Sequence, residues 1–189
     1  MSERRGDWQQ TFTGRQFWPL DPRVEDIDVR DIAHALALQC RFAGHCRVPY
    51  SVAEHSVRVA DLLLRQTGDD SIAFAGLLHD ASEAYCIDVP RPLKPWLAGY
   101  KAIERGVMYA VERWTGLFEG ACESPLVKRA DEVLLMTEAR DLMNEAPVPW
   151  TFAQHVEPLA EIIVPWGWET AERVFLARFK AFKAVPRVG

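Results

Sequence analysis

The 189-residue sequence lacks several features that mark common protein classes. It has no run of Lys or Arg and only a mild net charge of -5, so nothing indicates a surface for DNA or RNA. It has no apolar segment of signal-peptide type and no window near the roughly 20 apolar residues of a membrane span. These absences favour a cytoplasmic protein that binds neither nucleic-acid polymers nor membranes. They do not exclude a small anionic ligand, for which the local charge matters more than the net charge.

Cysteine is also scarce. The four cysteines contain no C-x-x-C pair, and reduced thiols are the default in a cytoplasmic chain. Cys40, His45 and Cys46 lie close together in the sequence, but a zinc knuckle needs a fourth ligand that the pattern does not supply. His34 and His155 likewise lack a pattern of partner ligands. We expect structural roles for these residues.

Alternating runs of strand length, internal repeats and low-complexity stretches are absent too. Apolar residues recur at spacings of three and four almost throughout, which predicts an all-α fold. With 49% hydrophobic residues, the chain is long enough for one well-cored domain over residues 1–189. Within it, glycine and proline in residues 1–26 predict an extended arm, whose apolar Phe12, Phe17 and Trp18 favour docking onto the body.

Start and stop signals divide the remainder into helices. Asp28 is a candidate N-cap for the first helix, and Ser51 with Glu54 predicts a capping box for the second. Ser124 and Pro125 open a later helix as cap and first-turn residue. The predicted helices cover about residues 29–42, 51–64, 70–85, 97–117, 125–143 and 169–182.

Four residues with metal-binding side chains fall on these helices. His55 shares the apolar stripe of its helix, and Asp131 shares that of a later one. His79 and Asp80 are adjacent on the third helix, and Glu83 is expected to project beside His79 because it follows four residues later. Buried imidazoles and carboxylates need partners, and a divalent cation would satisfy all four. We predict a metal site at His55, His79, Asp80 and Asp131.

The order His55, His79-Asp80 and Asp131 on successive helices resembles the HD-domain metal-dependent phosphohydrolases, which implies a helical bundle. Three stretches are similar to the bacterial 5'-deoxynucleotidases: VAEHS at 52–56, LLHDASEAYCIDVPRPLK at 77–94 and VKRAD at 127–131. The arm string TGRQFWPLDP and the string DIAHALALQCRFAGH at 31–45 are similar to phage and bacterial HD phosphohydrolases. Some of those enzymes are deoxyadenosine triphosphate triphosphohydrolases.

The resemblance implies one divalent ion. The ligand types do not fix its identity, because Mn, Co, Fe and Zn all accept this mixture, and Mg is also allowed. It further implies that Glu83 is a catalytic acid or base and that Asp88 aligns water or protonates the leaving oxygen, although a turn role for Asp88 stays open. Arg41 matches a phosphate-clamping arginine, while complementarity to a helix C-terminus explains a cation there as well. Lys94 is another phosphate candidate, for which we favour a solvated surface position.

The substrate is less well defined. Arg15 and Trp18 on the arm are candidates for contact with a nucleobase, although docking of an apolar arm explains Trp18 equally well. Glu83 is followed by Ala84, whereas alarmone hydrolases carry an acidic pair there, which disfavours that activity. We expect hydrolysis of a small deoxynucleotide, first as a 5'-deoxynucleotidase, second as a triphosphohydrolase, with a non-catalytic nucleotide-binding domain as a distant third. The resemblance also implies a homodimer.

Overall fold

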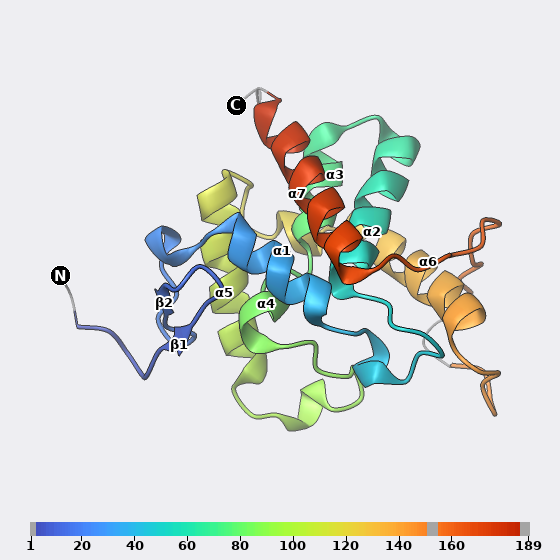
Figure 1. Cartoon of the computed structure of the whole chain (residues 1–189), viewed down its shortest axis with the longest axis horizontal. Helices are drawn as coiled ribbons and strands as arrows, with labels where there is room; N and C mark the ends of the chain where they lie inside the picture. The colour runs from blue at the N-terminus through green and yellow to red at the C-terminus, as the bar shows by residue number, and fades with distance from the viewer. Residues whose placement is uncertain (1–2, 151–154, 186–189) are drawn as a thin grey trace.

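The computed structural model describes residues 3–150 and 155–185, and most of this chain is helical (Figure 1), which confirms the all-α prediction. The first two residues of the predicted arm lie outside the described residues. In chain order, the main elements are the strands β1 (Gln9–Gln10) and β2 (Gln16–Phe17) and the helices α1 (Val29–Leu38), α2 (Val52–Thr67), α3 (Asp70–Leu78), α4 (Glu83–Cys86), α5 (Tyr100–Thr115), α6 (Pro125–Leu142) and α7 (Trp168–Ala184).

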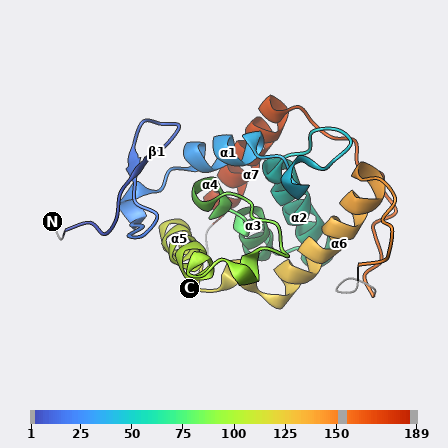
Figure 2. The same cartoon turned by 90° about the horizontal axis from the view of Figure 1, so that it is seen from below.

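The helices surround a core to which α2 and α3 contribute most of their length. These two helices pack side by side, α6 packs on α2, and α7 crosses α1, α2 and α3 (Figure 1). The arm lies at the α5 end of the body in both views (Figures 1 and 2). None of the described helices combines the length and the apolar character needed to cross a lipid bilayer.

The arm is more structured than the sequence pattern predicted. Its strands β1 and β2 pair antiparallel, with Gln9 opposite Phe17. Phe17 is fully buried, and its ring stacks on Tyr85 of α4 with 3.8 Å between the ring centroids. Phe12 stays 59% exposed and stacks on His34 of α1. Thr13 also donates from its amide and its hydroxyl to the Asp31 carboxylate on α1, so the arm contacts the body through both aromatic side chains and hydrogen bonds.

The N-termini of α1 and α2 follow their predicted caps. Asp28 accepts a hydrogen bond from the backbone of Arg30, and Ser51 Oγ accepts one from the Glu54 amide at 3.1 Å. The predicted capping box at α2 is only half formed, because the Glu54 carboxylate accepts from Arg58 and from the Trp166 amide instead. Glu54 thereby connects α2 to the segment that precedes α7.

The predicted end of the first helix is wrong. The first helix ends at Leu38 rather than near Phe42, because Cys40 leaves the helix and forms a β-bridge with Ser51. Arg41 therefore lies in the α1–α2 connection and not at a helix C-terminus. There its carbonyl accepts from the Cys46 thiol at 3.5 Å, a structural contact for that cysteine.

The third predicted helix is broken in the middle. Helix α3 ends at Leu78, and the chain tightens into turns in which the Ala81 amide donates to Leu78 and the Glu83 amide to Asp80, each at 2.9 Å. Bonds to the third preceding residue wind the backbone more tightly than an α-helix does. Glu83 therefore begins a separate helix, α4, and is not placed by regular helical spacing from His79.

Gly76 permits the close approach of α2 and α3. A Cβ atom at this position would collide with the side chains of Leu63 and Val59 on α2. Leu63 and Val59 are themselves fully buried, so they have little space to move. The small residue one turn before His79 thus brings His79 within reach of α2.

Candidate metal centre

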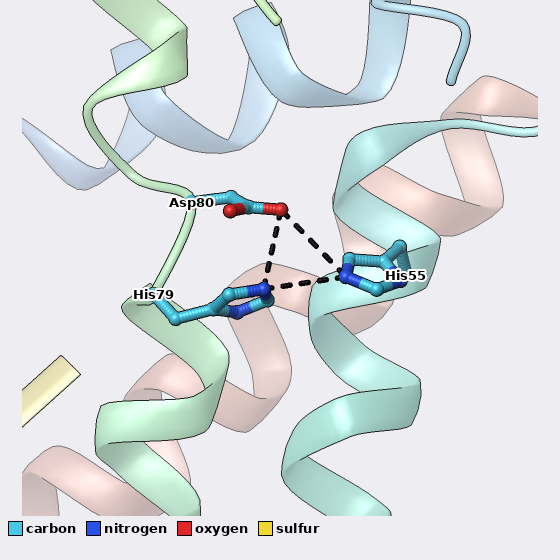
Figure 3. Close-up of side chains that lie close together, drawn as sticks. All are labelled: His55, His79 and Asp80. Carbon is cyan, nitrogen blue, oxygen red and sulfur yellow. Dashed lines mark hydrogen bonds and ion pairs between the residues drawn. The ribbon is translucent and has the colours of Figure 1, made fainter. Parts of the chain in front are cut away.

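Three side chains with metal-binding atoms converge between α2 and the end of α3. His55 lies near the start of α2, and His79 and Asp80 follow the last residue of α3. The two imidazoles and the carboxylate point toward one another (Figure 3), and one ligand atom from each lies within 4.8 Å of the others. His55 is fully buried, which distinguishes this group from an incidental cluster on the surface.

Each imidazole uses its Nδ1 atom for a hydrogen bond. His55 Nδ1 donates to Glu138 Oε1 at 2.6 Å, and His79 Nδ1 donates to the Gly76 carbonyl at 2.8 Å. A neutral imidazole carries a proton on only one nitrogen, so both Nε2 atoms are then unprotonated. These atoms face each other at 3.2 Å. Two lone pairs at this separation repel each other unless a cation lies between them.

The spacing of the donor atoms fits a single divalent ion. Two ligand atoms about 2.1 Å from one ion lie about 3.0 to 3.6 Å apart for coordination angles from about 90° to 120°. Asp80 Oδ2 lies 3.2 Å from His79 Nε2 and 3.6 Å from His55 Nε2. Asp131 Oδ1, on α6, lies 3.2 Å from His55 Nε2. The structure thus brings three of the four predicted ligands, His55, His79 and Asp80, into one group and places Asp131 against His55.

The charges in this centre keep the two ligand carboxylates ionised. Burial raises the pKa of Asp80, but the neighbouring histidines outweigh burial and lower this pKa overall. Burial also raises the pKa of Asp131, which the same histidines lower to about 2. Burial and Arg41 lower the pKa of His55, yet Glu138 and Asp131 raise it overall to about 10. In the metal-free protein, a proton on His55 therefore takes the place of a cation.

Glu83 and Asp88 form a second pair of carboxyl groups, whose pKa values are raised instead of lowered. Glu83 is 4% exposed, and its Oε2 atom is buried without a hydrogen-bond partner among the described residues. Burial, followed by repulsion from Asp80 and Asp88, raises the pKa of Glu83 well above its usual value. Burial raises the pKa of Asp88 as well. A carboxyl group with a raised pKa is suited to proton transfer near neutral pH.

The side chain of Gln39, at the end of α1, ties these two catalytic candidates together. Its Nε2 donates to the Glu83 carbonyl at 3.0 Å, and its Oε1 accepts from the Asp88 amide at 3.0 Å. Between them, Ile87 adopts a φ of 65°, which a β-branched residue rarely does. Asp88 is thereby turned back toward the site instead of continuing away along α4.

Arg41, a predicted phosphate contact, is buried at the centre and already paired. Its Nε donates to Glu138 Oε2 at 3.0 Å, and its Nη1 lies 3.6 Å from Asp80 Oδ2. A guanidinium has five N–H groups, so these contacts leave donors for a phosphate oxygen. The arginine therefore links the candidate ligand Asp80 to the buried Glu138.

Lys94, the other predicted phosphate contact, bridges two carboxylates rather than lying free in solvent. Its Nζ donates to Glu104 on α5 at 2.8 Å and lies 3.5 Å from Glu83 Oε1. Its side chain is 33% exposed. The favoured solvated position is thus replaced by an ion pair that positions Glu83.

The two candidates for nucleobase contact interact with other residues of the N-terminal segment. Arg15 Nη2 lies 3.2 Å from Asp28 Oδ2, and its Nη1 donates to the Glu25 carbonyl. The guanidinium of Arg4 lies 4.3 Å from the centre of the Trp18 ring. These contacts hold Arg15 and Trp18 within the N-terminal segment and do not bring them to the candidate ligands.

Sequence reasoning missed Glu138 and Arg91. Glu138 is fully buried on α6 and accepts from Tyr50 Oη at 2.9 Å in addition to its bonds with His55 and Arg41. It follows Asp131 by seven residues, so the two share one helix face, and this spacing was an available signal. Arg91 Nη2 lies 3.8 Å from Asp131 Oδ2 but comes from a proline-rich loop without periodicity.

Fold and site together define an all-α protein with a candidate His/Asp metal centre. Models of known protein families give no match. The chain is 37% identical over 172 residues to the uncharacterized protein YfdR of Escherichia coli, covering 90% of this chain and 92% of that protein. It is 35% identical over 143 residues to the uncharacterized protein RCAP_rcc00048 of Rhodobacter capsulatus, covering 71% and 72%. The chain belongs to the same family as YfdR.

Proposed function

We propose that this chain is a metal-dependent phosphohydrolase of the HD type that acts on deoxynucleotides. The observation that carries the proposal is the convergence of the His55 and His79 Nε2 atoms, 3.2 Å apart, with the Asp80 carboxylate beside them and both Nδ1 atoms already hydrogen-bonded. Such a buried arrangement is costly without a cation. It supports a site in which His55, His79, Asp80 and Asp131 hold one divalent ion, for which Mn, Co, Fe or Zn suit the mixed ligands.

The remaining residues supply proton transfer and phosphate binding. When bound, such an ion supplies a Lewis acid that polarises a phosphoryl oxygen and makes water acidic enough to act as a nucleophile. Glu83 accepts a proton from the attacking water, since its buried carboxyl has an unpartnered oxygen. Asp88, held beside it by Gln39, donates a proton to the departing oxygen as the phosphorus–oxygen bond breaks. Arg41 binds the phosphate through its remaining N–H groups.

The deoxynucleotide substrate class rests on the resemblance of residues 52–56, 77–94 and 127–131 to the 5'-deoxynucleotidases. The first candidate reaction is therefore hydrolysis of a deoxynucleoside monophosphate to a deoxynucleoside and phosphate. Release of triphosphate from a deoxynucleoside triphosphate is the second candidate. It is favoured by the arm, which resembles that of the triphosphohydrolases and packs through Phe17 onto the helix that begins with Glu83.

Product analysis with a panel of deoxynucleotides tests the proposal. The protein, loaded with Mn²⁺ or Co²⁺, should release phosphate from monophosphates or triphosphate from triphosphates. His79→Ala should abolish turnover, whereas His34→Ala, which removes a histidine paired with Glu172 on α7, should retain it. A metal-loaded protein that binds these nucleotides but hydrolyses none of them would overturn the enzymatic proposal.

A further inference from the structure

Glu138 is a buried carboxylate with an unusually complete set of donors. Its side chain is fully buried between α6 and α2. Oε1 accepts from His55 Nδ1 at 2.6 Å and from Tyr50 Oη at 2.9 Å, and Oε2 accepts from Arg41 Nε at 3.0 Å. Three donors, two from the α1–α2 connection and one from α2, leave this carboxylate little freedom to move.

The bond to His55 decides how that imidazole is used. A carboxylate accepts but cannot donate, so the proton of a neutral His55 stays on Nδ1 and the lone pair on Nε2. The same bond sets the rotation of the ring, because Nδ1 must point at Glu138. Nε2 is consequently directed at His79 and Asp80, 3.2 and 3.6 Å away. A different tautomer would present an N–H group to the cluster and prevent ligation.

Arg41 and Tyr50 hold the carboxylate in turn. Their backbones are paired by the bond from the Arg41 amide to the Tyr50 carbonyl at 2.9 Å, so both side chains come from one rigid segment. The guanidinium charge of Arg41 also compensates the charge of Glu138, which a fully buried carboxylate requires. Tyr50 itself is 1% exposed.

We propose that Glu138 is a positioning residue whose carboxylate, fixed by Arg41 and Tyr50, holds His55 in the tautomer and ring orientation that binds the divalent ion. This inference rests on the metal site of the proposed function and deepens it. Partners of this kind set metal affinity, and their loss typically weakens binding about 10- to 100-fold. Glu138 does not touch the ion or the substrate.

The test is the dissociation constant for Co²⁺, measured by calorimetry without any nucleotide, together with the visible spectrum of the bound Co²⁺. Glu138→Gln keeps the volume and one acceptor but loses the charge, and should weaken binding about 10-fold. Glu138→Ala should weaken it about 100-fold and alter the spectrum. If Glu138→Ala does not fold, as judged by circular dichroism, Glu138→Gln decides alone.

Glu54→Gln is the matched control. Glu54 is fully buried, lies beside His55 in the sequence and pairs with an arginine, Arg58, yet its carboxylate bonds lead away from the His55 ring to Arg58 and the Trp166 amide. Folded Glu138→Gln with wild-type Co²⁺ affinity would overturn the inference. So would an equal loss of affinity in Glu54→Gln, because charge alone would then explain it. Neither measurement involves hydrolysis, so a failure of the proposed reaction stays distinguishable.

Discussion

The carboxyl groups near the cluster fall into two sets with opposite environments. Asp80 and Asp131 face histidines, which lower their pKa values, whereas burial raises the pKa values of Glu83 and Asp88. Groups whose surroundings separate their pKa values in this way divide the work of a site between charge and proton transfer. The first two suit ligation of a cation, and the second two suit acid and base chemistry.

Glu83→Gln separates these two roles. Turnover should fall about 100-fold or more, because the amide cannot take up a proton, while Co²⁺ affinity stays within about threefold. Equal losses of turnover and metal affinity would instead make Glu83 a ligand. Asp61→Asn, which removes a partly exposed carboxylate paired with Arg178, is the control and should change neither property.

Glu83→Gln should also stabilise the metal-free protein at pH values above 4.5, the usual pKa of glutamate. A folded-state pKa that is raised means that the folded protein binds the proton more tightly, so wild-type stability falls as pH rises past 4.5. Glutamine removes this penalty. We expect a gain of about 1 to 3 kcal/mol near pH 8, as for relief of an unsatisfied buried group, and little gain near pH 4. Urea unfolding at both pH values measures it.

Binding of a divalent ion should release a proton from His55. With a pKa of about 10, His55 is protonated at neutral pH in the metal-free protein and must lose its proton before Nε2 can bind an ion. Apparent Co²⁺ affinity should therefore rise about tenfold per pH unit between about pH 7 and 9. Calorimetry in two buffers of different ionisation enthalpy counts the released protons. An affinity independent of pH would contradict the prediction.

The raised pKa of His55 also affects the stability of the metal-free fold. The protonated His55 contributes fully to the stability of the fold at pH values below 6.5, the usual pKa of histidine. This contribution is lost as the pH rises through about 10. This is the reverse of the ordinary acid lability of carboxylate pairs. A bound ion replaces the proton, so the stability of the loaded protein should depend less on pH in this range.

At the scale of single elements, the sequence predicted helix starts that depend on a local cap. It did not predict a helix break that depends on tertiary packing. The caps at Asp28 and Ser51 predicted the starts of α1 and α2 because a cap acts within its own turn. The break after Leu78 escaped prediction because the apolar pattern continues through it. The tight turns there depend on packing around His79 and Glu83, which local sequence does not report.

Gly76→Ala tests the close contact of α2 and α3. The added methyl would meet Leu63 and Val59 and should destabilise the protein by about 1 to 2 kcal/mol, since overpacking exceeds the gain in helix propensity. Co²⁺ affinity should fall too, because the Gly76 carbonyl orients His79. Gly106→Ala on α5 is the control: its methyl would lie 3.8 Å from Pro22, an ordinary contact, and should be neutral or stabilising. A stable Gly76→Ala with normal metal binding would refute the argument.

At the scale of the whole molecule, the sequence pointed to the candidate ligands but mostly not to the residues that hydrogen-bond to them and orient them. Helix faces and the family resemblance suffice to point to His55, His79, Asp80 and Asp131. Glu138 reaches His55 from a helix 83 residues further along the chain. A contact of that range depends on how α6 packs on α2, and only its shared face with Asp131 hinted at it. Local patterns thus predict which groups face inward, but not which of them meet.

The contact between the arm and α4 connects the N-terminal arm to the helix that carries Glu83. Phe17 is fully buried against Tyr85, which lies two residues after Glu83 in a helix of four residues. So short a helix is not stable by itself and depends on its packing. Phe17→Ala should therefore lower the free energy of unfolding by about 3 to 5 kcal/mol, as for other buried aromatic residues.

The same substitution should affect turnover more than metal binding. His55 and His79 come from α2 and from the end of α3, whereas Glu83, the proposed general base, begins α4, so loosening α4 displaces Glu83 first. We expect kcat to fall at least about tenfold, a misplacement effect, while Co²⁺ affinity changes about twofold. Phe118→Ala, which truncates a ring that is 70% exposed, controls for loss of a phenyl group and should leave stability within about 0.5 kcal/mol. If Phe17→Ala weakened metal binding and turnover alike, the arm would support the whole centre, because α4 would then not be the element that responds to it.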